Sequence, residues 1–274
     1  MGGFRRVAGF TLVELLVAML LLSTVLVGAL KVFSNHNRTY VEQDLSLSVE
    51  QNLRMGMGLV SDALRTAGYG VPLGSLSTWV PWVPGFNNNP QISPGAGGST
   101  NSVSIATCSA EPVARLAAAA AAGATTLTIT SNVPGSKISD LLDTGAQRLI
   151  LIGDSENAHI TGMTASSITI DTTPTFTGNQ GLRQAYPTDT PICRVDVVSF
   201  AVYTDKSTGL SWLSMDSNQG SGPQLAAEDI TNLVITAAGS RQYQITLTGQ
   251  SETVGPLSGK YLSRTLSSNI TLKN

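Results

Sequence analysis

One apolar run near the N-terminus constrains this chain more than any other feature. From Phe10 to Leu30 there are 21 residues with a single charge, Glu14. As a helix rising 1.5 Å per residue, this run is about 31 Å long, enough to cross the ~30 Å hydrocarbon layer of a bilayer. Arg5 and Arg6 precede it, so the positive-inside tendency keeps the N-terminus in the cytoplasm. The run therefore predicts a single-pass membrane anchor with the rest of the chain exported.

The run does not end as an ordinary secretory signal ends. A signal peptide has a small-residue cleavage site after its apolar core. Here the core leads through Lys31 into Val32 and Phe33, and the sequence stays compatible with a helix. The small residue stands before the apolar run instead, at Gly9. That order predicts processing on the cytoplasmic side, with an uncleaved signal anchor as the alternative.

The segment Gly9-Phe10-Thr11-Leu12-Val13-Glu14-Leu15 resembles the processing site of type IV prepilins and type II secretion pseudopilins. The resemblance implies that residues 1–9 are a leader, which a prepilin peptidase cleaves between Gly9 and Phe10. It also implies N-methylation of Phe10 and a role for Glu14, the fifth mature residue, in subunit assembly. The mature chain would have 265 of the 274 residues.

The same resemblance implies where the protein resides and what it contacts. A pilin-like subunit is stored in the inner membrane, in contact with lipid, with its head outside the cytoplasm. An assembly platform then extracts it, and its N-terminal helix joins those of other major and minor pilins in an extracellular filament.

The helical pattern continues beyond the membrane run. Apolar residues recur at three- and four-residue steps, the spacing of one helix face. They are Val41, Leu45, Val49, Leu53, Met57, Val60, Leu64 and Ala67. The pattern ends at Gly68, and Pro72 comes after it, the usual order of helix-stopping residues. We expect one helix from residue 10 to 67, with a membrane half at 10–30 and an amphipathic half at 31–68.

A β-rich extracytoplasmic head is predicted over residues 72–274. Short alternating segments there are typical of strands. They are 126–129, 148–152, 167–170, 195–203, 230–235, 243–247 and 268–272. Arg115 to Ala122 is interpreted as a short helix or a low-complexity loop, and Pro223 to Asp229 as the start of another short helix. The whole is an α+β fold of pilin type, with one long N-terminal helix packed on an antiparallel β-rich head.

The end of the long helix resembles one particular group of pilins. Arg65-Thr66-Ala67-Gly68-Tyr69-Gly70 is similar to the helix end of PilW-type minor pilins, and the closing Ile270-Thr271-Leu272-Lys273-Asn274 is similar to the end of such chains. This implies a minor pilin that initiates filament assembly or sits at the tip. Two alternatives stay open: a J-type minor pseudopilin of type II secretion, and a pilin-anchored adhesin or binding module with residues 79–200 as its ligand surface.

Composition argues against catalysis, a metal site and a cofactor. The chain has two histidines, His36 and His159, and Asp154-Ser155-Glu156-Asn157 lacks the glycine and distal glutamate of a calcium-binding EF-hand. Neither a phosphate-loop motif nor a nucleophile elbow is present in the sequence. A formal net charge of −2 argues against a nucleic-acid partner. We expect a structural subunit rather than an enzyme.

Cys108 and Cys193 are the only cysteines. Export to an oxidising compartment favours a disulfide between them. The alternative is two separate buried thiols.

Overall fold

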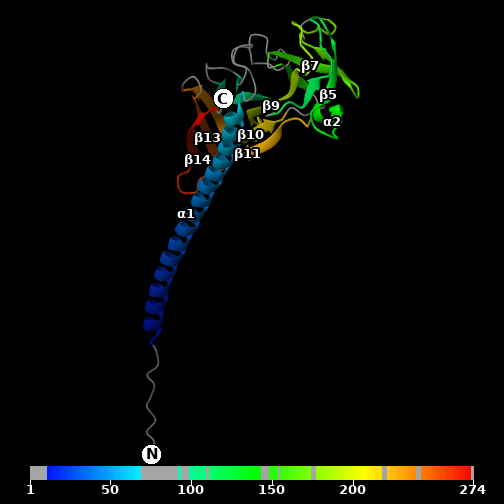
Figure 1. Ribbon diagram of the computed structural model, residues 1–274. Helices are drawn as coiled ribbons and strands as arrows, with labels where there is room; N and C mark the ends of the chain where they lie inside the picture. Colours follow the sequence, from blue (N-terminus) through cyan, green and yellow to red (C-terminus); the bar gives the residue numbers. More distant parts are fainter. Residues whose placement is uncertain are drawn as a thin grey trace, which may run out of the picture.

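The computed structural model describes residues 11–68, 92–93, 99–108, 111–142, 148–153, 155–173, 177–217, 221–238 and 242–272. A long N-terminal helix carries a β-rich head at its C-terminal end (Figure 1). The predicted α+β fold, with a long helix followed by antiparallel sheets, is confirmed.

The helix α1 spans Leu12–Thr66, 55 residues, and is about 82 Å long. Its predicted apolar stripe is the face that packs on the head: Val49, Leu53, Met57, Val60, Leu64 and Ala67 are buried. The first member of that stripe, Val41, is 41% exposed, because the helix has already left the head there. The helix ends where the backbone of Gly68 turns to a φ of 71°, which glycine adopts without steric cost.

The helix packs against a four-stranded antiparallel sheet with the order β14-β13-β12-β2. Its strands are β2 (Ser99–Thr100), β12 (Ile230–Ala237), β13 (Gln242–Val254) and β14 (Tyr261–Thr271). Gly249 on β13 lies directly under the helix: a Cβ there would lie 3.0 Å from a methyl carbon of Val49 and 3.2 Å from Cγ of Leu53. The missing side chain therefore lets α1 approach the sheet closely.

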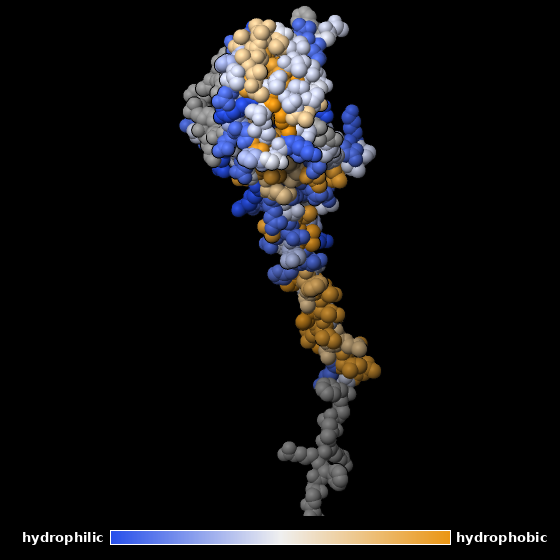
Figure 2. Space-filling model, turned by 45° about the vertical axis from the view of Figure 1, so that its right-hand side comes forward, coloured by the Kyte–Doolittle hydropathy of each residue, from blue (hydrophilic) through white to orange (hydrophobic). Residues whose placement is uncertain are grey.

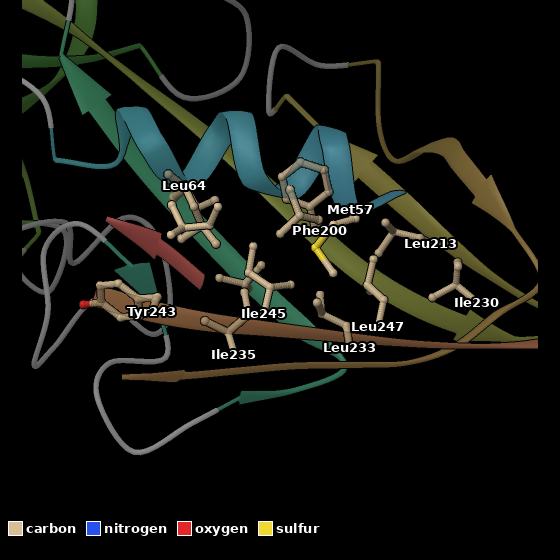
Figure 3. Close-up of a cluster of buried hydrophobic side chains, with 14 of the residues drawn as sticks. Met57, Leu64, Phe200, Leu213, Ile230, Leu233, Ile235, Tyr243, Ile245 and Leu247 are labelled. Atoms are coloured by element: carbon tan, nitrogen blue, oxygen red, sulfur yellow. The ribbon is translucent and has the colours of Figure 1, made fainter. Parts of the chain in front are cut away.

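The main core lies between the helix, this sheet and part of a second sheet. Met57 and Leu64 of α1 face Ile245 and Leu247 of β13, and Phe200 of the second sheet closes the cluster (Figure 3). This part of the head, which we call the base, fixes the C-terminal half of α1.

The second sheet has ten strands, and six of them close on themselves. The order β9-β4-β5-β8-β7-β6 returns to β9, because β9 also pairs with β6. The strands are β4 (Ala114–Leu116), β5 (Thr126–Ser131), β6 (Leu149–Ile152), β7 (Glu156–Met163), β8 (Ser167–Asp171) and β9 (Pro191–Thr204), and the helix α2 (Ile138–Leu142) lies between β5 and β6. The result is a small antiparallel barrel without a free edge.

The barrel has its own core. Ile150 and Ile152 of β6, Ile160 of β7 and Ile170 of β8 are fully buried in a cluster that includes no residue of α1. All the strands of the barrel except β9 lie between β3 and β9 in the sequence, and they form a lobe beside the base (Figure 1). We call the elements from β4 to β8 the distal lobe.

The strand β9 connects the lobe to the base. Its first residues belong to the barrel, and its later ones pair with β3 (Ser102–Cys108) and β10 (Ser211–Asp216). The remaining strands of this sheet are β1 (Ile92–Ser93) beside β3 and β11 (Gln224–Glu228) beside β10.

Two segments that were open to a helical interpretation are not helices. Ala114–Leu116 is strand β4, and residues 117–122 form no helix, in agreement with the loop alternative for that segment. Gln224–Glu228 is strand β11 and pairs with β10 from Trp212 to Met215. In both places the residues favour a helix locally, and pairing with a neighbouring strand outweighs that preference.

Candidate functional site

The site indicated by the sequence is the start of α1. Gly9 and Phe10, the predicted cleavage and methylation residues, lie outside the described residues. The next residue, Thr11, is the N-cap of the helix. Its hydroxyl accepts a hydrogen bond from the backbone N–H of Glu14 (3.3 Å).

The side chain of Glu14 in turn forms hydrogen bonds with Thr11. Its carboxylate accepts hydrogen bonds from the backbone N–H of Thr11 (2.9 Å) and from the Thr11 hydroxyl (3.1 Å). The two residues form a capping box, which satisfies two of the backbone groups left open at a helix start. This role was not predicted, although Thr-x-x-Glu before an apolar run is its signature. Glu14 thus has a local function in the isolated subunit.

The first half of α1 is exposed along its whole length. Its large apolar residues from Leu12 to Phe33 are all exposed on a helix that no other described residue covers. Figure 2 shows this segment as an orange stem below a head that is mostly blue and white. It is long and apolar enough to cross a membrane. An uncovered surface of this kind requires lipid or the helices of other subunits.

The two hydroxyl side chains within the apolar stem are satisfied without water. Ser23 donates a hydrogen bond to the carbonyl oxygen of Leu20, and Thr24 donates one to that of Leu21, each at 2.8 Å. Such local bonds remove the cost of placing hydroxyl groups in hydrocarbon. The stem therefore suits both a bilayer and the interior of a helix bundle.

Polar contacts fix the point where α1 leaves the head. Glu42 accepts hydrogen bonds from backbone N–H groups of the β13–β14 turn, and Arg264 of β14 donates one to the Ser46 hydroxyl (3.2 Å). Further along, the Asn52 amide donates to the carboxylate of Asp229 (3.1 Å). Burial raises the pKa of Asp229, and the Asn52 hydrogen bond opposes this. These contacts fix the direction in which the stem leaves the head.

The cysteines lie close together in the sheet, where the base meets the lobe. Both are buried, Cys108 at 4% and Cys193 at 8% exposure, and belong to one small cluster with Leu149 and Leu151. Cys108 on β3 is opposite Val195 on β9, so Cys193 stands two residues further along that neighbouring strand. The disulfide remains a prediction.

The two histidines occupy unrelated places. His36 is exposed on the stem, whereas His159 lies on β7 opposite Leu149 of β6. Burial lowers the pKa of His159, the charge of Arg148 lowers it further, and Asp171 acts in the opposite direction. Among the described residues, no group of three or more His, Cys, Asp or Glu side chains could hold a metal ion.

The calcium-like segment has a structural role in its described part. The Glu156 carboxylate, 6% exposed at the start of β7, accepts hydrogen bonds from the backbone N–H of Arg183 (2.8 Å) and from the Tyr186 hydroxyl (3.1 Å). Ser155 also bonds Tyr186 (2.9 Å). Glu156 thus ties the segment before β9 to the barrel wall, whereas Asp154 lies outside the described residues.

Comparison with known families supports the interpretation of the stem. Residues 4–30 match the family model described as the prokaryotic N-terminal methylation motif. No curated protein and no solved structure matches the chain at a significant level.

The motif and the structure together support one general kind of protein. The motif covers residues 4–30, which include Phe10 and the apolar run, and the exposed helix continues from them into a β-rich head. These features support a structural subunit of the type IV pilin or pseudopilin kind, processed by a prepilin peptidase and assembled with other pilins. They also fit anchoring in the inner membrane before incorporation into a filament.

Proposed function

We propose that this protein is a minor pilin, a low-copy subunit that initiates assembly of a type IV pilus or sits at its tip. In this proposal a prepilin peptidase removes residues 1–9 and Phe10 is methylated. The segment 10–30 holds the subunit in the membrane, 31–68 connects it to the head, and 72–274 forms the head. The PilW-type helix end at Arg65 to Gly70 supports the minor-pilin assignment.

The observation that carries the proposal is the bare apolar stem continuous with the methylation motif. A filament built by packing such stems buries their apolar surface when the subunit leaves the membrane. The distal lobe supports a minor role. A shaft subunit has identical neighbours on all sides, which would have to accommodate a lobe with its own core beside the base. A subunit at the tip lacks neighbours on one side.

A deletion strain tests this proposal. Loss of the gene should abolish or strongly reduce surface pili, and the gene carried on a plasmid should restore them. A tagged, functional copy should be found in sheared pili at far lower abundance than the major subunit, with immunogold label at filament tips. Normal piliation together with a block in protein secretion would assign the subunit to a type II secretion filament instead.

A further inference from the structure

The distal lobe carries an open pocket of about 820 Å³ at one end of its barrel. Four pieces of the lobe line it: the end of β5, the turn into α2, Arg148 directly before β6, and the β7–β8 turn. Ile129, Ile138 and Met163 contribute apolar side chains to its lining. Barrel mouths are recurrent ligand sites, and this volume lies in the usual range for small-molecule pockets, roughly 300–1,000 Å³.

The charge in the pocket is of one sign. Lys137 and Arg148 both line it, and no carboxylate is among the described residues of its wall. The chain as a whole is slightly acidic, with 16 basic and 18 acidic side chains, so two cations in the wall of one pocket are a local concentration of positive charge. Six hydroxyl side chains also line the pocket. The Ser139 hydroxyl donates a hydrogen bond to the carboxylate of Asp140, which is not a lining residue (3.1 Å), and the Ser131 hydroxyl donates one to the carbonyl oxygen of Val133 (2.9 Å).

The position of Arg148 is fixed by the barrel. It stands directly before β6 with a φ of 33°, a conformation that non-glycine residues rarely adopt. Its carbonyl oxygen accepts a hydrogen bond from the backbone N–H of Ile160 (2.9 Å), so the β6–β7 pairing holds this backbone in place. The residue is partly buried, whereas Lys137 is exposed. The barrel thus holds the backbone of the partly buried Arg148 in place, whereas the Lys137 side chain is exposed to solvent.

We propose that this pocket binds an acidic sugar, with the sugar carboxylate between Lys137 and Arg148 and the sugar hydroxyls on the surrounding serine and threonine side chains. Charge-assisted hydrogen bonds from two cations are the strong contacts of such a site. A nucleic-acid strand fits less well, because strand-binding grooves have aromatic stacking platforms and this pocket has no aromatic residue among its described lining. The proposal is independent of which filament the subunit joins.

Calorimetric titration of the full mature chain in detergent tests the site. The probes are trigalacturonate, the uncharged galactose trisaccharide and inorganic phosphate. We expect trigalacturonate to bind at least tenfold more tightly than the uncharged sugar, with weaker binding at higher salt. Equal affinity for the two sugars, or no binding of trigalacturonate, overturns the proposal. Binding of phosphate without trigalacturonate also overturns it and assigns a phosphate site.

Three variants localise the binding. Lys137→Gln removes the exposed cation, and Arg148→Asn removes the fixed one with a residue that tolerates positive φ. Each should weaken trigalacturonate binding about tenfold. Lys206→Gln, which removes an exposed cation in the β9–β10 turn outside the pocket, should leave the affinity unchanged. An unchanged affinity for Lys137→Gln contradicts the proposal even if the Arg148 variant fails to fold.

Discussion

Glu42 Oε2 lies 3.0 Å from the backbone nitrogen of Leu257 and ties α1 to a turn 215 residues later in the chain. The same oxygen accepts a second bond from the backbone N–H of Ser258 (3.3 Å). Both donors lie in the β13–β14 turn, so one carboxylate organises the turn and attaches it to the helix. This contact lies at the last point where α1 touches the head.

Glu42→Ala should lower the free energy of unfolding of the head by about 1 kcal/mol, because two backbone donors lose a charged acceptor. Hydrogen exchange should show faster exchange of the amides of Leu257 and Ser258. The matched control is Glu50→Ala on the same helix, which loses only an exposed ion pair with Arg54 and should cost less than about 0.5 kcal/mol. Equal effects of the two substitutions would contradict a specific role for Glu42.

Glu14 is expected to act through its charge during assembly. Glu14→Ala should be processed normally and remain in the membrane, yet be recovered poorly in sheared filaments. Cleavage creates a cationic amine at Phe10, and in a medium of low dielectric constant a carboxylate attracts that amine far more strongly than in water. Glu14→Asp, which keeps the charge on a shorter side chain, should be partly active.

Because Glu14 also caps the helix, a second pair of variants is needed to separate the effect of its charge from that of its capping role. Glu14→Gln keeps an acceptor for the backbone N–H of Thr11 but removes the charge, whereas Thr11→Ala removes the capping hydroxyl and keeps the charge. If the charge drives assembly, the glutamine variant should fail and Thr11→Ala should assemble. The opposite result would assign the function of Glu14 to helix capping alone. Wild-type incorporation of Glu14→Ala would make both roles dispensable.

Processing is predicted at one peptide bond. Mass spectrometry of membrane-extracted protein should find a mature chain that begins with N-methylated Phe10. Gly9→Val should block cleavage and leave a full-length precursor in the membrane. A retained Met1 in the wild-type protein, or cleavage after residue 30, would show that the prediction is wrong.

The disulfide between Cys108 and Cys193 is predicted to form after export. It would close a loop of about 85 residues, and the chain-entropy estimate of its effect is roughly 4 kcal/mol. Cys108→Ser should therefore lower the melting temperature of the head, while membrane insertion and leader cleavage stay intact. Peptide mapping without reductant should recover the linked pair. Alkylation of both thiols in the native and the denatured protein would exclude it.

His159 should make the barrel sensitive to acid. Its pKa is lowered in the folded state, so the unfolded chain binds the proton more readily. Its contribution to stability is therefore present above the unfolded pKa of about 6.5 and is lost as the pH falls below it. Between pH 7.5 and pH 5 the melting temperature should fall further for the wild-type protein than for His159→Gln. His36→Gln, on the exposed stem, should retain the wild-type dependence.

The long helix was predictable because its signals are local. The stripe from Val49 to Ala67 repeats every three or four residues, and Gly68 marks its end, so neither depends on the rest of the fold. The strand segments at 126–129 and 195–203 were found for the same reason. Local sequence patterns did not predict the secondary structure where pairing with a neighbouring strand determines it. Gln224-Leu225-Ala226-Ala227-Glu228 has the composition of a helix, and only its partner strand β10 makes it a strand.

The barrel and its pocket were not predictable in this way. Closure depends on β9 pairing with both β4 and β6, a relationship between residues 40 or more positions apart in the sequence. Lys137 and Arg148 are separated by α2 in sequence and become neighbours in one pocket only when the barrel closes. The residue pattern within either segment does not indicate that the two side chains line one pocket.

The insertion of the lobe between β3 and β9 has a mechanical consequence. The chain enters the lobe from the end of β3 and returns through the start of β9, and these two strands are paired from Ser102 to Cys108. A tensile load on the lobe therefore pulls both strands in the same direction. The load therefore acts in shear between this pair of strands and the rest of the base, and it does not peel one strand from the other. The hydrogen bonds along the strands bear the load together. The lobe is therefore attached in a manner that resists being pulled away from the base.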